Sequence, residues 1–389
     1  MRKKIIPSSV VTLLVIIFAS NMISFGFTQD NWNVKLGMHE GRSGLGTAAL
    51  NGTIYAIGGA TAKGFCSFNE QYNLTTDTWA FKSPMPTARS AFAIASLQNR
   101  IYCIGGYCGF GGNQLGATSA NEVYDPETDS WETKAPMLMP ELNVRANVAD
   151  GKIFVIGGNN NGTLNQVYDP ATDSWTTKAP IPTAVSSYAS AVAEDKIFVI
   201  TNDLTQIYNA RNNSWSIGIP APSPVILANA AATTGNFAPQ RIYVFGVDAQ
   251  LPYWQLSTKG FITQCYDPNT DNWTACSSLQ TGRYDVGITV VDDKLYLIGG
   301  FNTRFSSTEL DPNPTYIFST LNEQYTPIDY GAVPLTTSMI SSENIASDAT
   351  PTVAFALVGF GLSIFLAAVG TLAYLKKREK MKRRNGHQE

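Results

Sequence analysis

Ile101-Tyr-Cys-Ile-Gly-Gly106 and Tyr124-Asp-Pro-Glu-Thr-Asp-Ser-Trp131 are the two phrases that decide the fold of this chain. The first is typical of a buried strand ending in glycines, and the second of two strands joined by a tight turn. Six tryptophans recur at intervals of 40 to 58 residues, and five follow a tyrosine by seven positions. They are Trp32, Trp79, Trp131, Trp175, Trp215 and Trp273, with Tyr72, Tyr124, Tyr168, Tyr208 and Tyr266. A period near 50 residues built from short strands predicts a radial array of β-sheets.

Each repeat predicts four short antiparallel strands. In the first repeat, Asn51-Gly52 is a strong hairpin signal between a mildly apolar strand and a continuous apolar one. The third strand closes on a Tyr-Asp-Pro turn, and the fourth carries the tryptophan. A tyrosine and a tryptophan seven positions apart then face each other across a hairpin, where we expect them to pack between neighbouring sheets.

The repeats resemble the kelch family of β-propellers over roughly residues 30 to 326. The resemblance rests on the Gly-Gly pairs, on the turns that begin at Tyr124, Tyr168 and Tyr266, and on the tryptophan after each turn. Two repeats depart from the pattern, because Thr201-Asn202 and Gly246-Val247 stand where Gly-Gly is expected. We expect altered loops in those two repeats.

Strand counting predicts how the ring closes. The chain enters with a lone tryptophan-bearing strand at 31–36 and leaves after a third strand at 317–325 that has no tryptophan of its own. We therefore predict an all-β fold, a six-bladed kelch-type β-propeller over residues 29–326. The N-terminal strand completes the last blade, which removes an exposed sheet edge.

The ends of the chain predict export and anchoring. Residues 1–28 have the form of a signal peptide, with an uncleaved anchor as the alternative. Residues 327–351 are rich in Ser, Thr and Pro and are expected to form a stalk. The uncharged segment 352–375 is long enough for one transmembrane helix, and the basic segment 376–389 is expected to stay in the cytoplasm. These features predict a single-pass protein of the cell membrane with its propeller outside.

The charge is unevenly distributed. The formal net charge is −3, but residues 1–28 contribute +3 and residues 376–389 contribute +5, which leaves about −11 on the remainder. An acidic outer portion makes nucleic acid an unsuitable partner. Small residues at four-residue spacing in the membrane segment suit a weak homodimer; they are Gly359, Ser363, Ala367 and Thr371.

Sequons and cysteines suggest modifications suited to export. The candidate glycosylation sites are Asn51, Asn73, Asn161, Asn212 and Asn272. Cys66 and Cys108 fall in equivalent loops of adjacent repeats and suit a disulfide, whereas Cys103 lies inside a buried strand. Cys265 and Cys276 flank one hairpin on the same side but diagonally.

The position ten residues after each tryptophan is expected at the mouth of the central channel. It holds Arg42, Arg89, Glu141, Val185, Val225 and Arg283. In the kelch propellers that this chain resembles, arginines at this position often line a pocket for acidic groups. We therefore predict that Arg42, Arg89, Arg283 and Glu141 contact a ligand. The structural alternative is that each arginine ties down backbone carbonyls or pairs with Glu141.

Further candidates lie beside this mouth. Arg145 and Asp285 belong to opposite repeats on the channel side and are expected to meet as an ion pair across the axis. Tyr253 and Trp254 lie in a long loop, and Trp254 is the one tryptophan outside the repeat. Exposed aromatic side chains of this kind suit a sugar ring or a protein contact; packing of the loop on its own sheet is the alternative.

These features favour a non-catalytic binding or adhesion module for an extracellular protein or an acidic carbohydrate, with no cofactor and no metal. The alternative is a carbohydrate-active enzyme on acidic sugars, sialidase-like or sugar-isomerising. In that reading three arginines would converge with Glu141, Asp285 and Tyr284 nearby. His39 is the one histidine of the outer portion, which excludes a histidine-rich copper site and leaves no Ser-His-Asp set.

Overall fold

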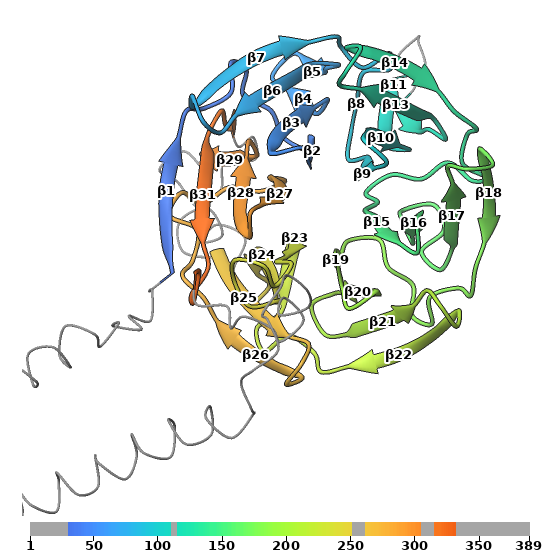
Figure 1. Cartoon of the computed structure of the whole chain (residues 1–389), viewed down its shortest axis with the longest axis vertical. Coiled ribbons are helices and arrows are strands. Elements are labelled where there is room, and N and C mark those ends of the chain that lie inside the picture. The colour runs from blue at the N-terminus through green and yellow to red at the C-terminus, as the bar shows by residue number, and fades with distance from the viewer. Residues whose placement is uncertain (1–29, 110–114, 251–260, 305–314, 332–389) are drawn as a thin grey trace, which may run out of the picture. The chain divides into compact units, whose positions relative to one another are not determined.

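The computed structural model describes residues 30–109, 115–250, 261–304 and 315–331. These residues form six four-stranded antiparallel sheets (Figure 1). Sheet 1 contains β2 (Gly46–Leu50), β3 (Thr53–Ile57), β6 (Asn69–Asn73) and β7 (Thr78–Lys82). Sheet 2 contains β9 (Ala93–Leu97), β10 (Arg100–Ile104), β13 (Asn121–Asp125) and β14 (Ser130–Thr133). Sheet 3 contains β15 (Ala146–Ala149), β16 (Lys152–Ile156), β17 (Asn165–Asp169) and β18 (Ser174–Thr177).

The other three sheets repeat this order, and the last one joins the two ends of the described chain. Sheet 4 contains β19 (Ala189–Ala193), β20 (Lys196–Ile200), β21 (Thr205–Asn209) and β22 (Ser214–Gly218). Sheet 5 contains β23 (Val225–Ala232), β24 (Ile242–Asp248), β25 (Phe261–Asp267) and β26 (Asn272–Ala275). Sheet 6 contains β27 (Gly287–Val291), β28 (Lys294–Ile298), β31 (Asn322–Thr326) and β1 (Asn31–Lys35), with β1 paired to β31.

The sheets stand around a common axis. Figure 1 shows β2, β9, β15, β19, β23 and β27 innermost, and β1, β7, β14, β18, β22 and β26 on the circumference. Neighbouring innermost strands contact each other: β2 contacts β9 and β27, and β19 contacts β15 and β23. The second strand of each sheet lies in the core; Ile101 to Ile104 of β10, for example, are all buried.

Glycine and asparagine stand where the backbone requires them. Asn51 and Gly52 both have positive φ, 50° and 69°, as the two-residue turn between β2 and β3 demands. At the end of β3, Gly59 has φ 101°, and a Cβ there would lie 2.8 Å from the Ser43 carbonyl oxygen. The Gly-Gly pair therefore lets two backbone segments approach more closely than any side chain would allow.

The predicted cross-strand aromatic pairs are confirmed. Tyr72 lies opposite Trp79 in the register of β6 and β7, with ring centroids 4.9 Å apart. The other tyrosine–tryptophan pairs of the repeat have the same register, and Trp32 of β1 packs against Tyr325 of β31 at 4.9 Å. These rings fill the space between neighbouring sheets, where aromatic contacts add to the burial of apolar area.

Each aromatic pair also carries hydrogen bonds that link one sheet to the next. The Trp79 indole donates to the Leu36 carbonyl oxygen (2.8 Å), in the segment that arrives from sheet 6. The Tyr72 hydroxyl donates to the Asp77 carboxylate (2.7 Å), which also accepts the Leu36 backbone N–H (2.9 Å). An Asp or Asn occupies this place, two residues before the tryptophan, in every sheet. These residues are Asp30, Asp77, Asp129, Asp173, Asn213 and Asp271.

The described chain ends in a turn held against sheet 5. The Gly331 backbone N–H donates to the Phe237 carbonyl oxygen (2.6 Å), and the Tyr330 and Phe237 rings stack. The predicted stalk, 327–351, thus begins with residues packed on the sheets, and its remainder lies outside the described residues. The segments predicted as signal peptide, membrane span and tail lie outside them too. Among the described residues no helix reaches the length and apolarity that a membrane crossing requires.

Candidate functional site

Antiparallel pairing places two kinds of connection on the same face of the molecule. These are the loops between second and third strands and the crossovers between sheets, and we call this the loop face. Three of its loops form short hairpins: β4–β5 (Ala60–Thr61 and Gly64–Phe65), β11–β12 (Tyr107–Gly109 and Leu115–Ala117) and β29–β30 (Phe301–Arg304 and Thr315–Phe318). The crossovers pair with them, as β8 (Arg89–Ser90) pairs with β11. The loop face of sheets 6, 1 and 2 therefore has additional ordered backbone.

The three arginines predicted to bind a ligand are buried inside their sheets and do not lie on the surface of the loop face. Arg42 is completely buried, and its guanidinium is bonded to the Glu70 carboxylate (2.8 Å) and to the Gly58 carbonyl oxygen (3.0 Å). Burial lowers the pKa of Arg42, and the adjacent Glu70 opposes that shift. Both terminal guanidinium nitrogens thus donate to acceptors around Arg42, while its Nε is buried without a partner among the described residues.

Arg89 and Arg283 repeat the arrangement. Arg89 forms an ion pair with Glu122 (2.5 Å) and donates to the Cys103 carbonyl oxygen (2.8 Å). Arg283 forms an ion pair with Glu323 and donates to the Leu297 carbonyl oxygen (2.8 Å). The structure therefore corrects the expected position at the channel mouth and supports the alternative that each arginine ties down carbonyls. The acidic partner is a glutamate of the same sheet's third strand and not Glu141.

The three sheets without an arginine at this position carry glutamine in place of that glutamate. In sheet 3, the Gln166 side chain accepts the Met139 backbone N–H (2.9 Å) and donates to the Met139 carbonyl oxygen (3.1 Å). Gln206 and Gln264 make the same two bonds with Thr183 and Ser223. In sheet 2, Glu122 accepts the Thr87 backbone N–H and Arg89 donates to the Thr87 carbonyl oxygen. One amide makes both of these bonds in sheets 3, 4 and 5, because it has both an acceptor and a donor. This covariation among repeats is a sequence signal that we missed.

Glu141 is also buried but has a different role. Its carboxylate accepts the backbone N–H groups of Asn160 (2.9 Å) and Asn161 (2.7 Å), which fixes the loop after β16. Burial raises the pKa of Glu141, and these two hydrogen bonds act in the opposite direction. A Cβ on Gly158 would lie 2.4 Å from this carboxylate, so the loop closes tightly around it.

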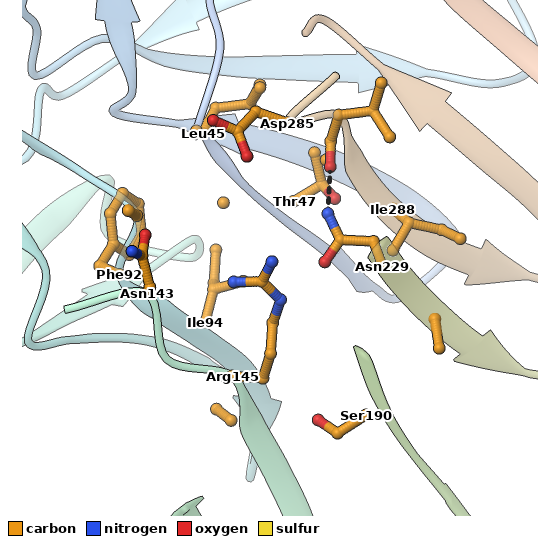
Figure 2. Close-up of a pocket in the computed structure, with 17 residues that line it drawn as sticks. Leu45, Thr47, Phe92, Ile94, Asn143, Arg145, Ser190, Asn229, Asp285 and Ile288 are labelled. Atoms are coloured by element: carbon orange, nitrogen blue, oxygen red, sulfur yellow. Dashed lines mark hydrogen bonds between the residues drawn. The ribbon is translucent and has the colours of Figure 1, made fainter. Parts of the chain in front are cut away.

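Arg145 and Asp285 do reach the axis. Both line a cavity of about 120 Å³ between the innermost strands, and Figure 2 shows their side chains entering it from different sheets. Among the described residues no ion pair joins them. Burial raises the pKa of Asp285, and the charge of Arg145 partly offsets that rise. The expected pair is therefore present as two separated charges in one cavity.

An exposed group of rings, which we call the aromatic cluster, lies on the loop face of sheet 1. The His39 and Phe81 rings stack at 4.8 Å, and Phe68 contacts Phe81 at 6.1 Å. Phe81 is 56% exposed, Phe68 38% and the His39 side chain 49%. The sequence signal was an aromatic residue two positions after Trp79, where polar residues or alanine follow Trp131, Trp175 and Trp273.

Comparison with known proteins agrees with the repeat. The kelch motif model matches residues 41–86 and 88–138. The chain is a kelch-repeat protein. It is 35% identical over 104 residues to Kelch-like protein terF of Aspergillus terreus (strain NIH 2624 / FGSC A1156), covering 26% of this chain and 21% of the relative. It is 26% identical over 195 residues to Kelch-like protein 26 of Danio rerio, covering 47% of this chain and 31% of the relative.

This kelch protein spans about an eighth to a third of the length of the curated relatives that it matches. Among solved structures it is similar to that of YjhT, with a TM-score of 0.58 and 15% identity, over 72% of this chain and 99% of the other. At that identity the likeness concerns the fold alone. The all-β architecture of four-stranded sheets fits a β-propeller.

The remaining candidates of the kelch protein have the following places. Cys66 and Cys108 are both free and buried, without the bond that the sequence suggested, and each lies near the arginine of its own sheet. Tyr253 and Trp254 lie outside the described residues. All five sequon asparagines are exposed, so each is accessible to a glycan. They are Asn51, Asn73, Asn161, Asn212 and Asn272.

Proposed function

We propose that this kelch protein is an exported binding module, held in the cell membrane by one span over residues 352–375. Its propeller has six blades, the N-terminal strand completes the last one, and the loop face binds an extracellular protein. The aromatic cluster of His39, Phe68 and Phe81 is the observation that carries the proposal. Exposed rings held in fixed mutual contact are typical of protein-contact hot spots, because they add area at little entropic cost.

The fixed geometry of this cluster supports its role as a contact site. His39 Nδ1 lies 2.6 Å from a Glu70 carboxylate oxygen, and the other oxygen of that carboxylate is bonded to Arg42. The Arg42 guanidinium also lies 5.8 Å from the centre of the Phe68 ring. A buried ion pair thus orients two of the three exposed rings. These rings therefore lose little conformational freedom when a partner binds.

Charge favours a protein over an acidic carbohydrate. Each arginine first assigned to acidic groups is neutralised by a buried glutamate, and the chain between its two basic ends carries about −11. An acidic sugar would approach a surface of like charge without a free guanidinium at the arginine positions. The sialidase-like alternative would not use these three arginines together, because Arg42, Arg89 and Arg283 each lie inside a separate sheet.

The test is surface cross-linking on intact cells that export the full chain, followed by mass spectrometry. Phe81→Ser removes the most exposed ring of the aromatic cluster. Ile217→Ser is the matched control, because Ile217 also stands two residues after its tryptophan and is 60% exposed, on sheet 4. We expect the wild type and Ile217→Ser to cross-link the same extracellular protein, and Phe81→Ser to lose it.

Other results would redirect the proposal. Retention of the partner by Phe81→Ser would remove the aromatic cluster from the interface. Binding of an acidic glycan on an array, or turnover of a sialoside, would favour the carbohydrate readings instead. A protease added to intact cells should digest the propeller and spare a C-terminal tag, and the reverse pattern would overturn the membrane orientation.

A further inference from the structure

The axial cavity contains two charges that are held apart. Arg145 projects into it from sheet 3 and Asp285 from sheet 6 (Figure 2). Within the part of the chain that the structure describes, the Arg145 guanidinium makes one hydrogen bond, to the Val144 carbonyl oxygen at 3.3 Å, and its buried Nε has no partner. Among the described residues, no hydrogen bond to the Asp285 carboxylate is found. Both residues are half-buried, and a charge that is partly withdrawn from water is stabilised by a group of opposite charge.

Backbone hydrogen bonds fix the position of Asp285 at this end of the cavity. At the loop-face end of the innermost strands, Gly44 N–H donates to the Asp285 carbonyl oxygen (3.1 Å) and Ala91 N–H to the Gly44 carbonyl oxygen (2.8 Å). Asn143 N–H then donates to the Ala91 carbonyl oxygen (2.9 Å), which joins sheets 6, 1, 2 and 3 in a backbone belt. All four residues of this belt have φ between 50° and 59°, a strained conformation for Ala91. Such strain persists only where the surroundings fix the conformation.

The cavity wall offers further unused polar groups. The Ser190 and Thr47 hydroxyls line it and are buried, and neither has a hydrogen-bond partner in the described ranges of the chain. Asn229 donates its amide to the Val286 carbonyl oxygen at 2.6 Å, and among the described residues its own side-chain oxygen accepts no bond. The cavity, of about 120 Å³, has room for several water molecules or for a small organic molecule.

We propose that this cavity binds a small zwitterion of the size of glycine or alanine. The ligand's carboxylate pairs with Arg145 and its ammonium group pairs with Asp285. A simple anion would be attracted by Arg145 but repelled by Asp285. A simple cation would be attracted by Asp285 but repelled by Arg145. Only a molecule that carries both charges satisfies both side chains at once. This site is independent of the protein-binding surface proposed above.

Two substitutions test the site with residues that other sheets already carry there. Asn143 stands in sheet 3 where Asp285 stands in sheet 6, so Asp285→Asn keeps the left-handed backbone. Ala189 stands in sheet 4 where Arg145 stands in sheet 3, so Arg145→Ala is tolerated by the repeat. The measurement is calorimetric titration of the full chain in detergent with glycine, acetate and methylammonium.

We expect glycine to bind the wild type at least tenfold more tightly than acetate or methylammonium. Each substitution should weaken glycine at least tenfold, and Asp285→Asn should improve acetate because the repulsion is gone. Equal binding of all three probes, or no binding of glycine to the wild type, would overturn the proposal. The wild-type series alone decides between these outcomes if a variant fails to fold.

Discussion

The Tyr325 hydroxyl donates a 2.8 Å hydrogen bond to the Asp30 carboxylate, across a sequence separation of 295 residues. Asp30 also accepts the Ser277 backbone N–H (2.7 Å) and hydroxyl (2.6 Å). It occupies in sheet 6 the place that Asp77 occupies in sheet 1. A residue of the ordinary repeat therefore fastens the first strand of the described chain to its last.

Asp30→Ala should weaken this attachment, because three donors lose their shared acceptor. We expect the free energy of unfolding to fall by about 1–3 kcal/mol, measured by urea unfolding. Asp30→Asn should recover part of the loss, since Asn213 fills the same place in sheet 4. Asn33→Ala, on the exposed side of β1, is the control; an equal loss there would show that the strand as a whole and not the carboxylate matters.

The pairing of arginine with glutamate predicts a specific double-variant result. Arg89→Val alone leaves the Glu122 charge buried without its partner and should cost about 3–5 kcal/mol. Adding Glu122→Gln converts sheet 2 to the pattern of sheet 4, which has Val185 and Gln206. The double variant should then lose only about 1–2 kcal/mol, for the cavity that valine leaves. Additive losses in chemical unfolding would contradict the role assigned to the glutamine.

The hydrogen bonds to Asp293 predict that the stability of the fold depends on pH. Burial would raise the pKa of Asp293, but hydrogen bonds from the backbone of Thr234, Phe237 and Ala238 outweigh burial and lower it. A lowered pKa in the folded state stabilises above the ordinary carboxyl pKa, and this contribution disappears as pH falls through the lowered value. The difference in stability between wild type and Asp293→Asn should therefore shrink on acidification, and Asp292→Asn at the exposed neighbouring position is the control for the substitution itself.

The pKa values of the cysteine thiols predict which pair is oxidised first. A hydrogen bond from Cys276 lowers the pKa of Cys265 to about 7, although burial opposes it. Burial instead raises the pKa of Cys66 and Cys108, and that of Cys103 to about 12. We expect diamide, which takes up the two thiol hydrogens, to form the Cys265–Cys276 disulfide first. Peptide mapping without reductant tests this, and earlier appearance of a Cys66–Cys108 bond would contradict it.

The sequence predicted the sheets better than it predicted the site. The seven-residue separation of Tyr72 and Trp79 determines which residues lie opposite each other in the hairpin. The lengths of the strands and of the turn allow one register for that separation. Spacing also placed Arg42 correctly at the start of an innermost segment, but it does not give the direction of a long side chain. Arg42 turns into its own sheet because backbone carbonyls and Glu70 accept its hydrogen bonds there. The match of Arg to Glu and of Val to Gln among repeats contained that information.

The exchange of charged pairs for glutamines divides the ring into two unlike halves. Sheets 6, 1 and 2 contain buried ion pairs, whereas sheets 3, 4 and 5 depend on neutral amides at the same places. The hydration free energy that opposes ion pairing becomes less favourable on heating. Sheets 6, 1 and 2 should therefore lose less of their stability at high temperature than sheets 3, 4 and 5. Thermal opening should therefore begin in the neutral half, and amide protons of β16, β20 and β24 should exchange with deuterium before those of β3 and β10.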